Sequence, residues 1–192
     1  MVTIVLGSSL APAQTADPAL QRVVTQGRGS LAFLLGNTES RQRLLGGCIN
    51  WDRVLLAMEE GKALGYVAFK HHLRGPYALR VQPFAQEFGK VQGWVRFAAF
   101  CLSEYREWRY SFLLYGLRVN KSARNRGIGS ALVQACCAHA GAEGFKDVFL
   151  EVPLSNDRAR ALYLHNGFDL LRKRWVPFPP VRSMHRLAEP AS

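Results

Sequence analysis

The sequence predicts an α/β protein in which one mixed, mostly antiparallel sheet is flanked by helices. Two strand-like runs, residues 53–59 and 63–71, are joined by a short Glu-Gly-Lys turn and indicate an antiparallel hairpin. Later in the chain, apolar runs alternate twice with helical segments, which is the pattern of strand–helix–strand crossovers. A chain of 192 residues with 48% apolar residues can bury one sizeable core. We therefore expect residues 1–192 to form a single domain.

The first third of the chain supplies a strand, two helices and the hairpin. Residues 2–6 are apolar and predict the first strand, and no basic residue precedes them as in a secretory signal. Asp17 followed by proline marks a helix start, so a helix is expected over residues 17–26. A second helix is expected over residues 30–45, where a Gly-Gly pair ends it.

The stretch 73–110 breaks the strand pattern and predicts a helical insertion between the third and fourth strands. Within it, apolar side chains recur at steps of three and four, which places them on one helix face: Trp94, Phe97, Cys101, Tyr105 and Trp108. We expect this face to pack on the body of the domain. A lid over a substrate pocket and a dimer interface are the alternatives.

The second half predicts strands and helices in alternation. The run over residues 111–119 is almost wholly apolar and fits a central strand. The remaining expected elements are a helix over 127–141, a strand over 147–152, a helix over 156–166 and strands over 168–176 and 181–187.

Charge and cysteines restrict the classes of partner. The formal net charge of +11 would attract polyanions or phosphate-rich small molecules. The basic residues are spread evenly, so we expect no nucleic-acid partner, and no apolar run nears the roughly 20 residues of a membrane span. The four cysteines form no C-x-x-C pair and suit reduced thiols in a cytoplasmic protein. Cys136, Cys137 and His139 lack the second cluster that a zinc site needs, so no metal is expected.

The strongest chemical signal is a glycine loop between the strand over 111–119 and the following helix. It reads Arg124-Asn125-Arg126-Gly127-Ile128-Gly129-Ser130. Glycines at a helix start leave backbone N–H groups open to an anion, and the helix dipole adds positive potential. The loop matches neither a P-loop nor a dinucleotide-binding turn. Taken alone it could also serve close helix packing, whereas Arg124 and Arg126 would add charge toward a pyrophosphate.

A second block, from Asn156 to Phe168, makes the loop more specific. Together the two blocks resemble the GCN5-related N-acetyltransferase (GNAT) superfamily, bacterial type. The first is similar to its R/Q-x-x-G-x-G/A loop after a strand ending in L-x-V, and the second to its N-x-x-A-x-x-L-Y-x-x-x-G-F motif. The match is strong over residues 111–170, while residues 1–72 agree in the order of elements.

The resemblance implies acetyl-CoA as cosubstrate and assigns its contacts. The loop amides would cradle the pyrophosphate, and the strand before the loop, bulged and splayed from its neighbour, would pair with the pantetheine arm. The Val119 N–H would point at the thioester oxygen. Asn156 would contact the pantetheine, cap its helix, or do both. The implied contacts are Leu117, Arg118, Val119, Arg124, Asn125, Arg126, Gly127, Ile128, Gly129, Ser130, Asn156, Ala159 and Tyr163.

The resemblance also implies catalytic roles. Tyr163 matches the tyrosine near the CoA sulfur and would act as general acid, although its spacing also suits a core aromatic residue. The strand over 111–119 departs from the family pattern because it carries no Asp or Glu. Glu151 on the next strand, in a stretch that resembles ribosomal-protein N-terminal acetyltransferases, is the best candidate base, directly or through water. Weaker candidates are Glu104, Glu107, His71 and His72.

The sequence therefore predicts an N-acetyltransferase that acts on a primary amine of a small molecule, amino acid or peptide. The amine would attack acetyl-CoA directly in a ternary complex, with the aromatic insertion shaping the acceptor side. The alternative is a CoA-binding regulator without turnover, suggested by the missing strand carboxylate, and a nucleic-acid-binding protein is a distant third. The chain is expected to be a monomer or homodimer.

Overall fold

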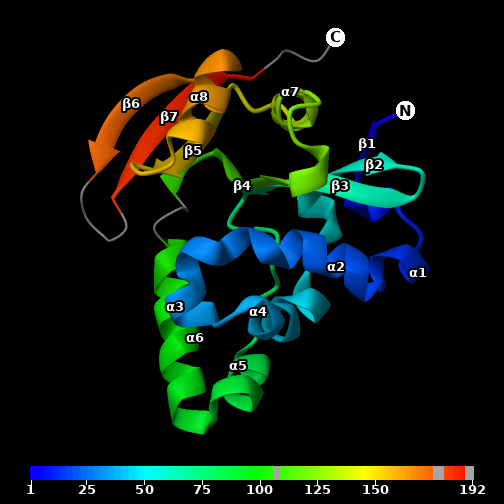
Figure 1. Ribbon diagram of the computed structural model, residues 1–192. Coiled ribbons are helices and arrows are strands. Elements are labelled where there is room, and N and C mark those ends of the chain that lie inside the picture. The colour runs from blue at the N-terminus through cyan, green and yellow to red at the C-terminus, as the bar shows by residue number, and fades with distance from the viewer. Residues whose placement is uncertain (106–108, 175–179, 189–192) are drawn as a thin grey trace.

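The computed structural model describes residues 1–105, 109–174 and 180–188. Their strands form one seven-stranded sheet in the order β1-β2-β3-β4-β5-β7-β6 (Figure 1). Within the described ranges, β4 and β5 pair in parallel and the other neighbours are antiparallel. The predicted mixed, mostly antiparallel sheet is confirmed. The strands are β1 (Thr3–Leu6), β2 (Val54–Glu59), β3 (Lys62–His71), β4 (Phe112–Val119), β5 (Asp147–Pro153), β6 (Asp169–Arg174) and β7 (Val181–Leu187).

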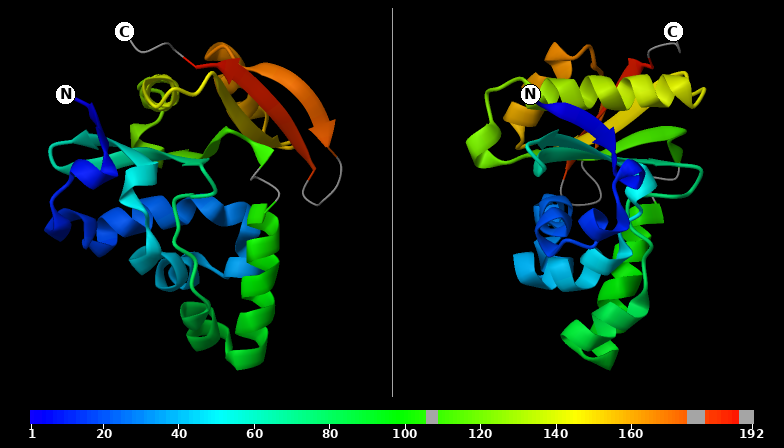
Figure 2. Two further views of the ribbon diagram at one scale, coloured as in Figure 1. Left: turned by 180° about the vertical axis from the view of Figure 1, so that it is seen from behind. Right: turned by 90° about the vertical axis from the view of Figure 1, so that its right-hand side faces the viewer.

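Helices cover both faces of this sheet (Figures 1 and 2). The helices of the first half lie on one face, and those of the second half on the other. The α-helices are α1 (Pro12–Thr15), α2 (Pro18–Thr25), α3 (Ala32–Leu35), α4 (Thr38–Leu45), α5 (Val81–Phe88), α6 (Lys90–Tyr105), α7 (Ile128–Ala142) and α8 (Asp157–His165). Short 3₁₀ turns connect them: η1 (Gly7–Ser9), η2 (Gln26–Leu31), η3 (Gly46–Cys48), η4 (Trp51–Arg53) and η6 (Lys121–Ala123). No described helix is long and apolar enough to cross a membrane.

The central strands β3 and β4 are mostly apolar because helices cover both faces of the sheet there. Val67 and Phe69 of β3 point into the cluster beneath α7, where Leu132 is wholly buried. Their neighbours Tyr66 and Ala68 point to the opposite cluster, which α2, α4, α5 and α6 complete. Alternate side chains of a strand face opposite sides of a sheet, so a strand between two helical layers reads as one apolar run.

The prediction of one helix over residues 30–45 is wrong. Gly36 adopts a φ of +74°, which ends α3. Asn37 then caps α4, because its Oδ1 accepts a hydrogen bond from the Ser40 N–H at 2.9 Å. A helix stop followed directly by a helix start divides the segment in two. By contrast, the predicted cap at Asp17 is confirmed, since its Oδ1 accepts from the Ala19 N–H at 2.9 Å.

The insertion is helical, as predicted, but the face predicted to pack on the body is only partly buried. Phe100 of α6 is wholly buried, whereas Trp94 is 58% exposed and Tyr105 62% exposed. The reason is Gly93, which packs directly on α5, where any Cβ would collide with the Phe84 carbonyl. This close approach fixes which side of α6 is buried. The expectation that Trp94 and Tyr105 pack on the body is wrong, and Trp108 and Glu107 lie outside the described residues.

A bulge and a splay in the sheet prepare a groove. Along the β3–β4 pair, Ala68 lies opposite Gly116 and Phe69 opposite Leu114, so Tyr115 is an extra residue on β4. The parallel β4–β5 pairing covers only two positions of β4, Leu113 and Leu114. Beyond them the two strands separate, and β4 presents an unpaired edge. The bulged and splayed strand that the family resemblance implied is confirmed.

Candidate active site

Two adjoining cavities follow the opened edge of β4. The inner cavity, about 370 Å³, is lined by β4, β5, η2 and α6. The loop cavity, about 490 Å³, is lined by the end of β4, the glycine loop and α8. The two cavities share Leu117, Arg118, Asn156, Ala159 and Tyr163. They form one continuous groove that brings together the two sequence blocks.

The loop cavity is built from backbone groups at the start of α7. Gly127 has a φ of +74° and open space where a side chain would project. Among the described residues, the N–H groups of Ile128, Gly129 and Ser130 have no hydrogen-bond acceptor, as expected for a first helical turn. Such N–H groups and the positive end of the helix dipole suit an anion. The loop end of the groove therefore fits a phosphate or pyrophosphate.

Side chains hold the loop in this shape. The Arg124 Nε donates to the Val119 carbonyl at 3.3 Å. Asn125 adopts a φ of +63°, and its Oδ1 accepts from Arg158 Nη2 at 3.3 Å. A Cβ on Gly129 would lie 3.4 Å from the Leu162 side chain, which is an ordinary van der Waals contact, and a Cβ on Gly127 would meet nothing. Helix packing therefore does not require either glycine, and the geometry favours the anion-binding interpretation.

The two expected loop arginines have different surroundings. Arg124 lines the loop cavity. Arg126 lines neither cavity, because its guanidinium forms a two-pronged ion pair with Glu59 at 2.7 and 3.1 Å. This hydrogen-bonded guanidinium lowers the pKa of the Glu59 carboxyl. The charge expected from Arg126 comes instead from Arg158, which the sequence analysis missed although it follows Asn156 by two positions.

Tyr163 occupies the junction of the two cavities. It packs edge-on against Phe168 at a ring distance of 5.7 Å and is 7% exposed. Its hydroxyl makes no hydrogen bond to any described residue. Burial raises the pKa of this hydroxyl well above the ordinary tyrosine value, so it stays protonated at neutral pH. Tyr163 is therefore both a core aromatic residue and a proton-bearing group that faces the groove.

Glu151 projects from β5 into the inner cavity. Its Oε1 accepts hydrogen bonds from Arg109 Nη2 at 2.6 Å and from the Tyr110 hydroxyl at 2.9 Å. The Tyr110 hydroxyl also lies 3.2 Å from Ser183 Oγ on β7. Burial raises the pKa of Tyr110, which keeps this hydroxyl a donor. The structure thus places Glu151 at the groove but ties it to partners that no sequence motif indicated.

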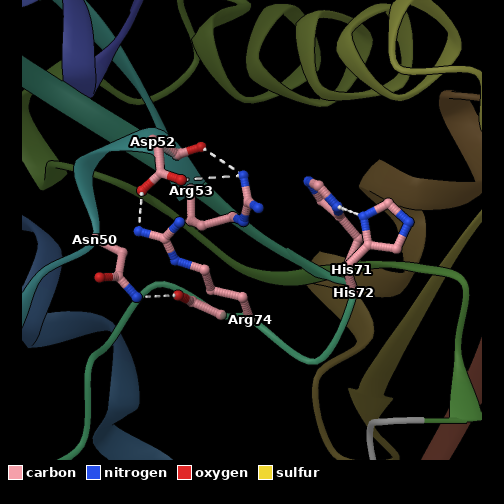
Figure 3. Close-up of polar contacts among 7 residues, drawn as sticks. Asn50, Asp52, Arg53, His71, His72 and Arg74 are labelled. Carbon is pink, nitrogen blue, oxygen red and sulfur yellow. Dashed lines mark hydrogen bonds and ion pairs between the residues drawn. The ribbon is translucent and has the colours of Figure 1, made fainter.

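The weaker base candidates lie away from the groove. Glu104 lines neither cavity, since its carboxylate pairs with Lys70 Nζ at 3.2 Å and accepts from the Tyr115 hydroxyl at 2.7 Å. His71 and His72 face a separate cavity near the start of β4, with their Nδ1 atoms 3.1 Å apart (Figure 3). Burial, together with the nearby Arg53 charge, lowers the pKa of His71 to about 4.

The remaining predicted contacts follow the strand edge. Leu117 and Arg118 line both cavities, whereas Val119 lines only the loop cavity. The Asn156 Oδ1 accepts from the Ala159 N–H at 3.1 Å, which confirms the expected helix cap and holds both residues at the groove.

All four cysteines are free thiols, and Cys136 and Cys137 are wholly buried. The described residues contain no cluster of His, Cys, Asp and Glu that could hold a metal ion.

The mixed sheet, the open strand edge and the glycine-rich helix start are together the features of the acetyltransferase fold class. The model of the Acetyltransferase (GNAT) family matches residues 36–168, well over half of the chain. The chain belongs to this family. No curated protein matches it by sequence.

Solved structures share the fold at low sequence identity. Ard1 from Thermoplasma volcanium superposes with a TM-score of 0.59 at 15% identity, covering 98% of both chains. A GNAT-family acetyltransferase from Bacillus cereus gives 0.59 at 12% identity, over 98% of this chain and 99% of its own. Drosophila melanogaster polyamine N-acetyltransferase gives 0.56 at 14% identity, over 97% and 100%. These likenesses establish the fold that the chain shares with acetyltransferases.

Proposed function

We propose that the protein transfers an acetyl group from acetyl-CoA to a primary amine, with residues 1–192 acting as one acetyltransferase domain. The observation that carries the proposal is the groove, because it places an anion-binding helix start, an unpaired strand edge and Tyr163 in one line. Each of these serves a different part of one long ligand. The amine would attack the thioester directly in a ternary complex.

The groove fits acetyl-CoA along its length. The N–H groups from Gly127 to Ser130 would bind the pyrophosphate, with Arg124 and Arg158 adding charge. The unpaired edge of β4 offers backbone donors and acceptors to an extended pantetheine arm, as a sheet edge does to an added strand. Asn156 and Ala159 line the opposite wall. When bound, acetyl-CoA would supply an activated acyl group to this edge.

The catalytic groups follow from the same geometry. The Tyr163 hydroxyl, protonated at neutral pH, would donate its proton to the departing sulfur. Glu151 supplies the one carboxylate among the described lining residues, so it would accept the proton of the amine, directly or through water. Backbone N–H groups of β4 would stabilise charge on the thioester oxygen. Val119 is the expected donor, and it lines the loop cavity together with Leu117 and Tyr163, so this edge of β4 would supply the N–H group.

The acceptor is a small amine, an amino acid or a peptide amine. Proteins of the same fold act on or bind different molecules. One solved structure is a polyamine N-acetyltransferase, and another is a NatC complex bound to a Gag peptide and CoA. The alternative is a CoA-binding regulator without turnover. It is favoured by the absence of Asp and Glu from β4 and by the Arg109 ion pair on Glu151.

The test is a calorimetric titration of the purified protein with acetyl-CoA, repeated on a Gly127→Glu variant. A glutamate there places a carboxylate against the phosphate and strains a backbone with positive φ, so we expect a loss of affinity of at least about 100-fold. Gly144→Glu is the matched control. Gly144 also has a positive φ, +82°, and open space around it, but it follows the other end of α7.

Three outcomes are decisive. Micromolar binding by wild type and by Gly144→Glu, together with its loss in Gly127→Glu, would support the proposal. A folded wild-type protein that gives no heat at about 100 µM acetyl-CoA would contradict it. Binding of acetyl-CoA without CoA release across a panel of amines would favour the regulator.

A further inference from the structure

Arg118 leaves a positive charge unsatisfied at the wall of the inner cavity. Its Nη1 and Nη2 donate to the Gln26 carbonyl and to Gln26 Oε1 at 3.4 and 3.2 Å, which are long for a charged donor. Its Nε is fully buried and has no hydrogen-bond partner. The guanidinium therefore contacts neutral oxygens from one residue and keeps donor capacity to spare.

No carboxylate among the described residues pairs with Arg118, although two lie in the same region. Glu151 is bound by Arg109, and Glu104 is bound by Lys70. Each of these carboxylates has a cation of its own, so the Arg118 charge is not neutralised within the described part of the cavity. A buried N–H without a partner costs free energy, and buried polar groups in proteins are normally satisfied. Because the Nε is fully buried, an anionic group of a ligand in the cavity would reach the Nη atoms, whose present bonds to neutral oxygens are long, and would neutralise the guanidinium charge there.

The rest of the inner cavity suits a small ligand with an apolar part. Leu31 and Tyr115 contribute apolar and aromatic surface, whereas Tyr66 and Tyr77 are almost wholly buried and add little. The Tyr77 hydroxyl donates to the Val24 carbonyl at 3.2 Å and the Tyr115 hydroxyl to Glu104, which leaves the Tyr115 ring as the aromatic wall. A volume of about 370 Å³ lies in the ordinary range of small-molecule pockets.

We propose that the acceptor of the proposed acetyl transfer carries a carboxylate, which the guanidinium of Arg118 binds, in addition to the amine that is acetylated. This inference rests on the proposed function. A planar guanidinium matches the two oxygens of a carboxylate, whereas a second ammonium group, as in a polyamine, would lie beside an uncompensated positive charge. The apolar part of the lining, from Leu31 and Tyr115, leaves room for an apolar side chain on the same acceptor.

The experiment compares amino acids with the amines that lack only the carboxylate. Phenylalanine and phenethylamine form one pair, and methionine and 3-(methylthio)propylamine form another. Each is titrated calorimetrically into protein saturated with CoA, which fills the groove without permitting turnover. We expect the amino acid of a pair to bind at least about tenfold more tightly than its amine, since hydrogen bonds between charged groups are stronger than those between neutral groups.

Variants assign the preference to the side chain. Arg118→Ala and Arg118→Gln should abolish it, and the glutamine variant keeps a polar stem in case alanine disturbs the fold. Arg118→Lys should keep part of it, because lysine retains the charge but not the planar fork. Gln26→Ala is the matched control, since it removes the side-chain oxygen that Arg118 contacts but keeps the backbone carbonyl contact and the guanidinium. It should preserve the preference.

Acetyl-CoA affinity, measured on the same proteins, separates this inference from the proposed function. A wild type that fails to bind acetyl-CoA contradicts the proposed function itself. With acetyl-CoA bound normally, the inference is overturned if neither amino acid binds better than its amine, or if the preference survives in both Arg118→Ala and Arg118→Gln. It is also overturned if these variants weaken acetyl-CoA binding instead, because Arg118 would then belong to the CoA site.

Discussion

The two ends of the groove are built in different ways. The loop cavity is made largely by one continuous segment, residues 117–130, and its ligand-facing groups are backbone N–H donors. The inner cavity is made by side chains from η2, β3, α6, β4, β5 and β7. One end depends on local backbone conformation, and the other depends on how distant elements pack. A local segment can be recognised in a sequence, whereas a set of distant contacts can be recognised only in the fold.

Breaking the packing of the insertion should therefore destabilise the elements on the side of the inner cavity and leave binding at the loop cavity almost unchanged. Phe100 of α6 is wholly buried in the cluster beneath the sheet. Phe100→Ala should lower the free energy of unfolding by about 3–5 kcal/mol through lost burial and a cavity. Because α7 and the glycine loop lie on the other face, acetyl-CoA affinity at a temperature where the variant is folded should change by less than about threefold. Chemical denaturation and calorimetry would measure the two effects.

Leu102→Ala is the control for this prediction. Leu102 lies on the same helix but is 71% exposed, so its removal should cost less than about 0.5 kcal/mol. If Phe100→Ala weakened acetyl-CoA binding as strongly as Gly127→Glu, the two ends would not be independent.

A change at the junction of the two cavities should lower the catalytic rate without changing the affinity for acetyl-CoA. Tyr163→Phe removes one hydroxyl and keeps the ring that packs on Phe168. We expect kcat to fall about 1000-fold, about 4 kcal/mol, within the usual range for a general acid. Acetyl-CoA affinity should stay within about threefold. Steady-state kinetics with the best acceptor would measure the rate, and Tyr105→Phe on the exposed side of α6 is the control.

The pH profile adds a second readout for Tyr163. Burial raises the pKa of its hydroxyl, so the donor form persists above the ordinary tyrosine value of about 10. The wild-type rate should therefore show no alkaline loss from this group below about pH 10. A Tyr163→Phe variant with an unchanged kcat would remove the tyrosine from the mechanism and leave it a core residue.

How much of the molecule the sequence could predict follows the same division. The individual strands, the α7 loop and the Asn156 cap were predictable because each rests on residues close together in the chain. The split between α3 and α4 at Gly36 was readable locally but was missed, since the apolar spacing on either side suits one helix. The Arg109–Glu151 ion pair was not predictable, because its partners are 42 positions apart and share no motif.

The burial of α6 in the insertion also could not be predicted from residues close together in the chain. Helical periodicity placed Trp94 and Tyr105 on one face with Phe97, but periodicity states which residues share a face and not which face is buried. The Gly93 contact with α5 decides that, and it depends on the turn between the two helices. The Arg126 ion pair with Glu59 is a similar case, because β2 lies far from the loop in sequence.

The smallest expected effect concerns Glu151, which lines the inner cavity from β5. Glu151→Gln keeps an oxygen that can accept hydrogen bonds from Arg109 and Tyr110, so the fold around it should persist and the change reports mainly the lost charge. We expect kcat to fall about 100-fold, about 2.7 kcal/mol. The deficit should shrink as the pH approaches the pKa of the acceptor amine, because an amine that is already neutral needs no base. Arg109→Ala is the companion variant: a base role predicts that it keeps most of the rate. If both variants lost equal activity at every pH, Glu151 would instead hold the inner cavity in shape, and the proton would leave through water.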